Sequence, residues 1–303
     1  MKCVKVPRRD LSQVKIPKAP GYDIVFEGDF ALIPIIEDVK GLEVVECLPK
    51  KRDVTPRLNE IVNGISSFYI IGDIMVLSPK NELPRETLQK ILDMYKVRSI
   101  YVKKRVSGEL RVSELIHLAG EKRTTTTFSE NGIKYFVNIS KVYVNPSMAT
   151  ERIKMAEVIP PGSIVLDAFT GYGALALHLA KRLGYAVAGD LNLDGLLMAL
   201  VSVKMNSKKI LVDLVQYDAK HLPFRGRVFD WVIGDNPTMI MDFIDEMCRV
   251  GKTLVIYKLG RLEEGWERVN DYSKDLVIMK RLIRCNENNV DLSFPESGHQ
   301  VSS

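Results

Sequence analysis

Polar side chains stand at the ends of four apolar runs in the C-terminal half of the chain. They are Asp167 in "SIVLDAF", Asp190 in "YAVAGDL", Asp218 after "ILVDLVQY" and Asn236 after "VFDWVIGD". Carboxylate and amide oxygens accept hydrogen bonds from hydroxyl and amino groups. Because ligands of open α/β sheets bind at the carboxyl ends of the strands, these four positions predict a ligand-binding site.

The first of these strand ends continues through Phe169 into a glycine-rich turn. Gly171 and Gly173 would let the backbone approach a ligand closely, and an apolar helix, "ALALHLAKRLG", follows them. Asp190 and Leu191 come about 20 residues later, where an acid can accept hydrogen bonds from both hydroxyls of a ribose. The two strand ends together predict a cofactor that contains a nucleoside.

The other two strand ends sharpen this prediction. Asp218, followed by Ala219, is placed to bond an adenine amino group, and Asn236 with Pro237 ends the fourth strand. The ordered set resembles class I S-adenosylmethionine-dependent methyltransferases, in which the glycines lie under the methionine moiety and the two acids bind ribose and flank adenine. A dinucleotide site is the alternative, with Ala176 at the third glycine position, but no diphosphate-binding or hydride-handling group stands out. We therefore predict S-adenosylmethionine as the cofactor.

A second stretch of the chain indicates which methyltransferase family the sequence resembles. The run from residue 108 to residue 159 resembles the archaeal and eukaryotic tRNA (guanine-37, N1)-methyltransferases in its succession of an arginine, a G-E pair, E-N-G, K-V-Y-x-x-P and E-R. The N-terminal segments "CVKVPRRD" and "GDFALIPI" resemble that family's first domain, which contacts the tRNA away from the target base. The resemblance covers essentially the whole chain and implies a tRNA methyltransferase, with tRNA as its partner.

The resemblance also implies roles for individual residues. Glu151 in "ATER" matches the general base of the family, Arg111 in "GELR" the arginine that meets O6 of the flipped guanine, and Tyr143 in "KVYVNP" the tyrosine between base and cofactor. Guanine N1 carries a proton, so its methylation needs a base for that proton and a positive group for the charge that develops at O6. Asn236 is expected to hold the edge of the base together with Arg111.

Each of these residues also has a structural alternative. A glutamate in the first turn of a helix, such as Glu151, often only stabilises the helix through its interaction with the positive end of the helix dipole. Arg111 lies in a basic stretch in which any arginine could be solvated or contact a phosphate, and Tyr143 could belong to the core. The family resemblance favours the functional interpretation of all three.

Two departures from the family pattern leave related activities open. Thr238 follows Asn236-Pro237 where the family usually carries an N-L-P or N-P-P motif, and Ser147 stands where it usually carries an arginine. Enzymes of wyosine biosynthesis share this architecture, and they methylate C7 of the tricyclic intermediate or transfer an aminocarboxypropyl group. A non-catalytic tRNA-binding protein on the same fold is a third possibility, against which the retained carboxylates and glycines argue.

The spacing of apolar residues predicts the helices and strands that position these side chains. Apolar runs alternate with helical stretches beyond residue 162, which predicts a Rossmann-like, doubly wound α/β domain. Upstream, we expect a hairpin at 68–78, a helix from Pro84, and strands at 99–106, 128–139 and 141–146, with Asn131-Gly132 as a tight turn. A helix from about residue 148 to residue 158 leads into the last domain.

The N-terminal segment completes the domain plan. Two short apolar runs in 22–36, separated by Gly28-Asp29, predict a hairpin in a small α/β module. We therefore expect an N-terminal tRNA-contacting domain at 1–62, a basic middle α+β domain at 63–150 and the methyltransferase domain at 151–303. The formal charges of these segments are +1, +5 and −1, so the middle domain carries the excess positive charge.

Composition limits the remaining possibilities. An apolar content of 46% and a net charge of +5 exclude a wholly disordered or histone-like chain. The four cysteines show no C-x-x-C pattern, so we expect reduced structural thiols, no metal site and no disulfide framework. No apolar run reaches the roughly 18 to 20 residues that span a bilayer, which predicts a cytoplasmic protein without a membrane partner. A family enzyme that reads one tRNA per chain is expected to be a monomer.

Overall fold

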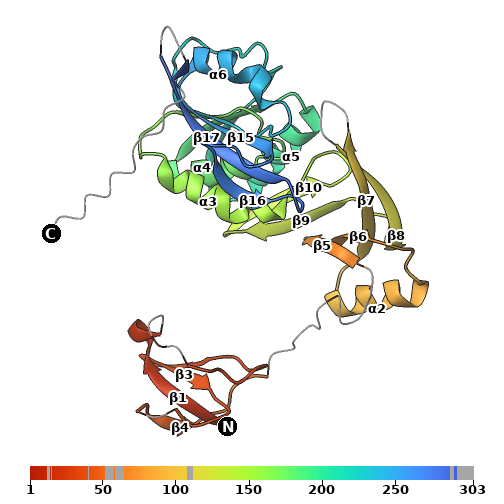
Figure 1. Ribbon diagram of the computed structural model, residues 1–303, viewed down its shortest axis with the longest axis vertical. Coiled ribbons are helices and arrows are strands. Elements are labelled where there is room, and N and C mark those ends of the chain that lie inside the picture. Colours follow the sequence, from red (N-terminus) through yellow and green to blue (C-terminus); the bar gives the residue numbers. More distant parts are fainter. Residues whose placement is uncertain are drawn as a thin grey trace, which may run out of the picture. The chain divides into compact units, whose positions relative to one another are not determined.

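The computed structural model describes residues 1–11, 14, 16–39, 41–51, 58, 65–107, 112–286 and 290–291 (Figure 1). The chain divides into two compact units, Met1–Asn63 and Gly64–Ser303. The middle and C-terminal segments, which the sequence separates at residue 150, lie together in the second unit. No helix within the described ranges is long and apolar enough to cross a bilayer.

The N-terminal unit is built on a four-stranded antiparallel sheet. Its strands, in the order β2-β3-β1-β4, are β1 (Lys2–Pro7), β2 (Val25–Glu27), β3 (Phe30–Pro34) and β4 (Val44–Glu46). A 3-10 turn, η1 (Arg8–Asp10), follows β1. The predicted hairpin is confirmed, since Gly28 links β2 to β3 with φ +53°, a conformation that glycine adopts without steric cost. Val4, Val6 and Ile33 lie in the core of this unit.

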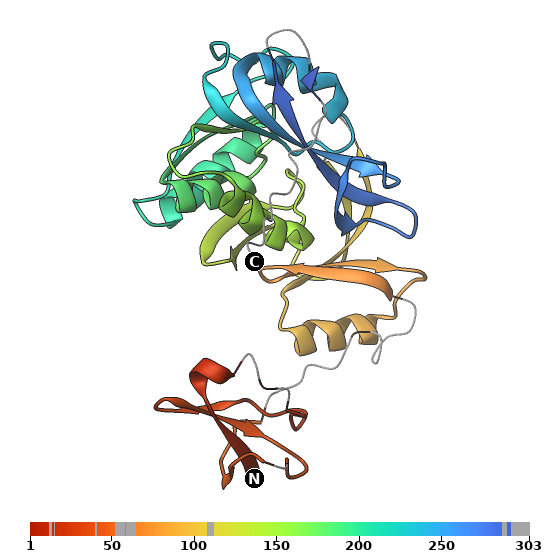
Figure 2. The same ribbon diagram turned by 60° about the vertical axis from the view of Figure 1, so that its left-hand side comes forward.

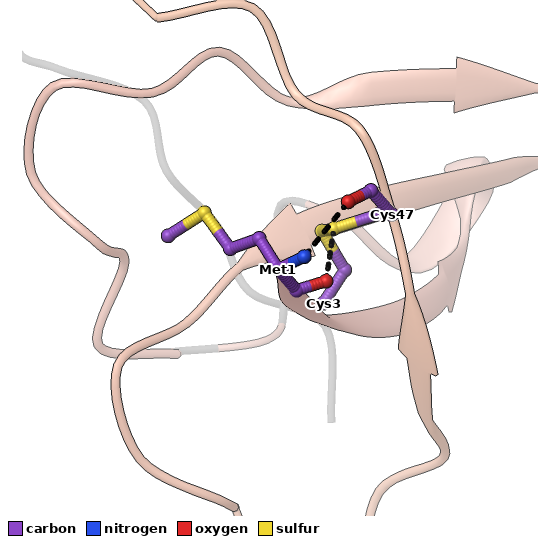
Figure 3. Close-up of a disulfide and its surroundings, with 3 residues drawn as sticks. All are labelled: Met1, Cys3 and Cys47. Carbon is purple, nitrogen blue, oxygen red and sulfur yellow. Dashed lines mark hydrogen bonds between the residues drawn. A yellow bond between two sulfur atoms is a disulfide. The ribbon is translucent and has the colours of Figure 1, made fainter.

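The cysteine prediction was wrong, because all four cysteines form disulfides. Cys3 on β1 is bonded to Cys47, just after β4, and the Met1 ammonium donates to the Cys47 carbonyl oxygen over 3.1 Å (Figure 3). Cys248 is bonded to Cys285 in the second unit. The partners are 44 and 37 residues apart in sequence, and only strand pairing and helix packing bring them together. Spacing along the chain therefore carries no signal of either bond.

A mixed sheet begins the second unit. Its strands, in the order β5-β6-β7-β8, are β5 (Ile65–Ile71), β6 (Ile74–Pro79), β7 (Ser99–Ser107) and β8 (Val112–Gly120). Helix α2 (Arg85–Tyr95) joins the parallel strands β6 and β7 and buries Leu88 and Ile91 on one face of the sheet (Figure 2). The predicted hairpin and helix are confirmed. Strand β8 was not predicted, because Glu114 and His117 interrupt its apolar pattern.

A separate hairpin connects this sheet to the large sheet of the unit. It consists of β9 (Thr125–Glu130) and β10 (Ile133–Asn138), and Asn131 and Gly132 turn it with φ values of +53° and +73°, as predicted. A Cβ on Gly72, in the β5–β6 turn, would lie 2.2 Å from Thr126 Oγ1, so only glycine allows this turn to approach β9 so closely. The predicted strand at 141–146 was wrong, because the backbone there turns and enters a 3-10 turn, η2 (Pro146–Met148).

The large sheet confirms the predicted Rossmann-like, doubly wound α/β architecture. Strands β11 to β15 are parallel, and β17 and β16 join antiparallel at one side, giving the order β13-β12-β11-β14-β15-β17-β16. The strands are β11 (Val165–Asp167), β12 (Tyr185–Asp190), β13 (Leu211–Gln216), β14 (Phe229–Gly234), β15 (Gly251–Gly260), β16 (Glu267–Asp271), β17 (Val277–Cys285) and β18 (Val290–Asp291). The strand order reverses between β11 and β14, where ligands of such sheets bind.

Helices pack on this sheet and complete its core. They are α3 (Ala149–Val158), α4 (Ala174–Leu183), α5 (Leu193–Met205), η3 (Ile240–Phe243) and α6 (Ile244–Val250). The predicted helix at about 148–158 is confirmed as α3. Strand β10 packs on α5, where the Phe136 backbone N–H donates to Ser202 Oγ over 2.9 Å. The β9–β10 hairpin is therefore attached to the large sheet through α5.

Candidate active site

The predicted strand-end residues meet in one pocket at the carboxyl ends of the parallel strands. Its lining includes nearly all of the predicted cofactor residues, namely Asp167, Phe169, Gly171, Asp190, Leu191, Asp218, Ala219, Asn236 and Pro237. Glu151 and Tyr143 line the same pocket. Gly173 does not line it. This glycine begins α4 with φ +83°, and a Cβ there would lie 2.8 Å from the Leu177 side chain.

Asp167 is the most deeply buried carboxyl group of the pocket. Thr170 Oγ1 donates to its Oδ2 over 2.8 Å, whereas its Oδ1 is buried without a hydrogen-bond partner. Burial, and then the nearby carboxylates of Asp235 and Asp190, raise the pKa of Asp167 to about 7. Buried polar atoms are rarely left without partners, so Oδ1 is an acceptor that could receive a hydrogen bond from a ligand.

Asp190 ties two of the ligand-binding loops together. Its Oδ2 accepts the Gly171 backbone N–H over 2.7 Å, and its Oδ1 accepts the Asn192 backbone N–H over 2.8 Å. Burial raises the pKa of Asp190. Because a carboxylate has about four acceptor positions, these backbone bonds leave it able to accept from a ligand as well.

Tyr217 lines the pocket next to Asp190. A Cβ on Gly189 would lie 2.1 Å from the Tyr217 ring, so this ring requires glycine in the neighbouring strand. The Tyr217 hydroxyl donates to the Ala168 carbonyl oxygen over 3.3 Å. Asp218, directly after it, is exposed at the pocket rim and accepts the Lys220 backbone N–H over 2.9 Å.

The residues directly after β14 also line the pocket. Asn236 Oδ1 is buried without a hydrogen-bond partner and belongs to the pocket lining. The Pro237 carbonyl oxygen accepts the Leu259 backbone N–H over 2.8 Å, which fixes the turn after Asn236 to β15. Asn236 thus offers a second unused acceptor, as Asp167 does.

Glu151 lies in the first turn of α3 and faces into the pocket. Its side chain is only 8% exposed, and its Oε1 accepts hydrogen bonds from the Tyr257 hydroxyl and from Lys280 Nζ, each over 2.9 Å. The helix N-cap is Met148, and no side chain caps the helix. These contacts argue against a mere capping role for this glutamate.

Arg152, the next residue, anchors α3 from its other side. Its guanidinium donates to both carboxylate oxygens of Glu130, at 2.7 and 2.6 Å, and both side chains are more than nine-tenths buried. His178 Nε2 lies 3.6 Å from Glu130, and burial lowers the pKa of His178. The two neighbouring residues therefore have different roles. Arg152 holds the helix against the β9–β10 hairpin, whereas Glu151 faces the pocket.

Tyr143 reaches the pocket from the segment between β10 and η2. Lys103 Nζ, on β7, lies 4.5 Å from the centre of its ring, in a cation–π contact. Asn192 Nδ2 donates to the Lys141 carbonyl oxygen over 2.8 Å, which ties the Tyr143 segment to the loop after β12. Arg111, the fourth predicted catalytic residue, lies outside the described residues.

Sequence reasoning missed several residues of the pocket and its surroundings. Tyr257 and Lys280 are register partners on β15 and β17, and both contact Glu151. Tyr272, which is half-exposed in the β16–β17 turn, also lines the pocket. The pairing of β15 with an antiparallel strand is the signal that would have revealed the first two, and it is not readable from local periodicity.

Two protein-family models match the chain. The TRM5/TYW2 methyltransferase domain matches residues 126–286, and the TYW2 N-terminal domain matches residues 55–124. The first match spans the β9–β10 hairpin and the large sheet that forms the pocket. The second contains the whole sheet formed by β5 to β8.

Individual relatives extend the similarity over most of the chain. The tRNA (guanine(37)-N(1))-methyltransferase Trm5b of Pyrococcus abyssi is 32% identical over 291 residues, which cover 87% of this chain and 86% of that protein. Its crystal structure has a TM-score of 0.63 at 26% identity and covers 93% of this chain and 98% of that chain.

Two further proteins are similar to this chain, one in fold and one in part of its sequence. The structure of aTrm5 in complex with tRNALeu is similar in fold, with a TM-score of 0.66 at 23% identity, covering 94% of this chain and 99% of that chain. The tRNA 4-demethylwyosine(37)-methyltransferase Taw21 of Saccharolobus solfataricus is 30% identical over 147 residues, which cover 45% of this chain and 55% of that protein.

Proposed function

Because the chain belongs to the TRM5/TYW2 methyltransferase family, we propose that it transfers the methyl group of S-adenosylmethionine to N1 of guanosine 37 in tRNA. The observation that carries the proposal is the buried carboxylate of Glu151, which faces the four polar strand ends across a single pocket. A cofactor on the strand ends would present its methyl group toward that carboxylate. Similarity to a guanine-37 enzyme over most of both chains supports this choice of reaction.

The strand ends offer a place for each part of the cofactor. Asp190 would bind the ribose hydroxyls, and Asp218 with Ala219 would flank the adenine. Asp167 Oδ1 and Asn236 Oδ1, both without partners, would accept hydrogen bonds from the amino group of the methionine moiety or from the target base. Bound in this way, S-adenosylmethionine supplies an electrophilic methyl group.

The acceptor side of the pocket supplies the base catalysis. Transfer of the methyl group to guanine N1 would break its bond to sulfur and release the cofactor as a thioether, so the N1 proton would have to pass to a base. Glu151 Oε2 would take that proton, because Oε1 is already engaged by Tyr257 and Lys280. Arg111 would stabilise negative charge at O6, and Tyr143 would lie at the junction of base and cofactor.

A target base beside the anticodon must leave its stack before it can react, and aromatic side chains offset part of that cost. Tyr143 and Tyr272 line the pocket and provide such surfaces. We propose that the flipped guanine lies between these rings and Glu151.

Binding of the tRNA itself is supported by surfaces outside the pocket. In the N-terminal unit, Lys5 Nζ lies 4.5 Å from the Phe30 ring centre and the Arg8 guanidinium 4.8 Å from that of Phe26, and both rings are partly exposed. Cations beside exposed rings suit phosphates and unstacked bases. The +5 charge of residues 63–150 adds a second basic region.

The decisive experiment is mass spectrometry of nucleosides from unmodified tRNA incubated with the protein and methyl-labelled S-adenosylmethionine. We expect the label in 1-methylguanosine at position 37. The Glu151→Gln variant should lose about two to four orders of magnitude in the single-turnover rate, the usual contribution of a general base. Retention of the full rate by that variant would remove the role proposed for Glu151.

A wyosine-pathway transferase is the second candidate. The match of residues 55–124 to the TYW2 N-terminal domain and the partial similarity to Taw21 favour it. Label at a carbon of the tricyclic base, or incorporation of an aminocarboxypropyl group, would support it. The longer similarity to Trm5b favours methylation of guanosine.

A further inference from the structure

The C-terminal antiparallel strands place a polar row beside Glu151. Tyr257 on β15 is the register partner of Lys280 on β17, and Lys280 is in turn the register partner of Glu267 on β16. Directly opposite side chains in a sheet share one face, so the three lie side by side. The row runs from the buried Tyr257 through Lys280, which is 14% exposed, to Glu267, which is 63% exposed.

Lys280 is shared between two carboxylates. Its Nζ lies 2.9 Å from Glu151 Oε1 and 3.3 Å from Glu267 Oε1. The first contact is largely buried and the second is open to water, so the attraction to Glu151 is much less screened. A carboxylate that is 8% exposed and faces no cation would favour its protonated form, which cannot accept another proton.

We propose that Lys280 is a positioning residue for the methyl transfer, holding Glu151 as an ionised carboxylate with Oε2 turned toward the N1 proton of the base. This inference rests on the proposed function. Tyr257 supports the same arrangement, because burial and then the Glu151 carboxylate raise its pKa, so its hydroxyl remains a donor.

The other charges around Glu151 do not replace Lys280. Arg152, on the same helix, is turned to Glu130 and forms a bidentate ion pair there. The charged groups that face the Glu151–Tyr257 pair from the neighbouring elements are Lys280 from β17, Asp235 after β14 and Asp167 at the end of β11. The two aspartates are acidic, so among the described residues Lys280 supplies the positive charge that faces Glu151.

The test is the pH dependence of the single-turnover methylation rate in four forms of the full chain. Lys280→Met should lower the rate at pH 7 by about tenfold and move the acid limb of the profile upward by about one pH unit, the usual effect of losing an adjacent cation. Lys280→Arg should return the acid limb toward its wild-type position. Glu267→Gln removes the second carboxylate that pairs with Lys280 and keeps the Lys280–Glu151 ion pair. This variant should therefore cause no upward shift of the acid limb.

Lys252→Met serves as the matched control, because its ion pair with Asp230 is exposed and lies outside the pocket lining. Thermal melting and calorimetric binding of S-adenosylmethionine show whether each variant is folded. If Lys280→Met does not fold, the inference is tested on Lys280→Arg and Lys280→Gln. A folded neutral variant with the wild-type profile, or a rate loss without movement of the acid limb, would overturn it.

The outcome is separable from that of the proposed function. In the Glu151→Gln background, Lys280→Met should cause almost no further loss, since the residue acts through Glu151. Full activity of Glu151→Gln would contradict the proposed base itself. If activity requires Glu151 but a neutral residue at position 280 leaves the pH profile of the methylation rate unchanged, only the role of Lys280 is contradicted.

Discussion

Individual side chains in the pocket are kept in unusual states by burial. Asp167 and Asn236 each have an oxygen without a partner, and the Glu151 side chain is only 8% exposed beside Lys280. Such states cost free energy in the isolated protein and are expected where a ligand completes the hydrogen bonding. The pH dependence of ligand binding should therefore report on them.

For Asp167, we expect cofactor affinity to depend on pH. Its pKa is raised to about 7, so the carboxyl group is protonated below that pH and ionised above it. S-adenosylmethionine is cationic, so the ionised form should bind it better, and affinity should fall about tenfold per pH unit below about pH 7. Calorimetric titration from pH 5.5 to 8.5 measures this, and the dependence should disappear in Asp167→Asn. Equal affinity at pH 6 and pH 8 in the wild type would refute the expectation.

At the scale of elements, the pocket is assembled from strand ends and one helix. The strand ends could be predicted from the sequence, because parallel strands direct their carboxyl ends to one edge of the sheet and local apolar runs reveal them. The contacts of Glu151 could not, since the register of β17 against β15 brings together Tyr257 and Lys280, which are separated by 22 intervening positions. The segment of Tyr143 was misread as a strand because its alternation of apolar and polar residues is that of a strand.

Helix α3 depends on its buried ion pair, and we expect Arg152→Met to be strongly destabilising. Removal of one partner leaves the Glu130 carboxylate buried without its cation, which typically costs about 3 to 5 kcal/mol. In a unit of this size that corresponds to a fall in Tm of roughly 10 °C. Arg268→Met is the control, because its pair with Asp271 is exposed and should contribute at most about 1 kcal/mol. Equal melting curves for the two variants would contradict this account.

At the scale of the whole molecule, each of the two compact units contains one disulfide. We expect the Cys3–Cys47 bond to account for much of the stability of the N-terminal unit, because it closes a loop of 44 residues. The chain-entropy model gives about 4 kcal/mol for a loop of this length. Calorimetric melting of the Cys248→Ser/Cys285→Ser variant, with and without a reducing agent, isolates this bond. Unchanged melting after reduction would show that the bond contributes little.

The distribution of charge predicts different salt responses for the two ligands. Residues 63–150 carry +5 and residues 151–303 carry −1. Binding of tRNA should weaken steeply with salt, because each phosphate contact releases about 0.7 to 0.9 counterions. Cofactor binding in the enclosed pocket should change little between 50 and 300 mM salt, on the order of twofold or less. Filter binding for tRNA and calorimetry for the cofactor measure the two slopes, and equal slopes would argue against this division.

The second disulfide has a consequence for the accuracy of strand pairing. A strand that slips by one residue turns every side chain to the opposite face of the sheet, so a slipped β17 would present Met279 or Arg281 to Glu151 in place of Lys280. Cys285, at the end of the same strand, is covalently fixed to Cys248 on α6. The disulfide therefore fixes the register of β17 against β15. Because Lys280 lies five residues before Cys285 on this strand, the disulfide also fixes the position of the Lys280 ammonium group next to Glu151.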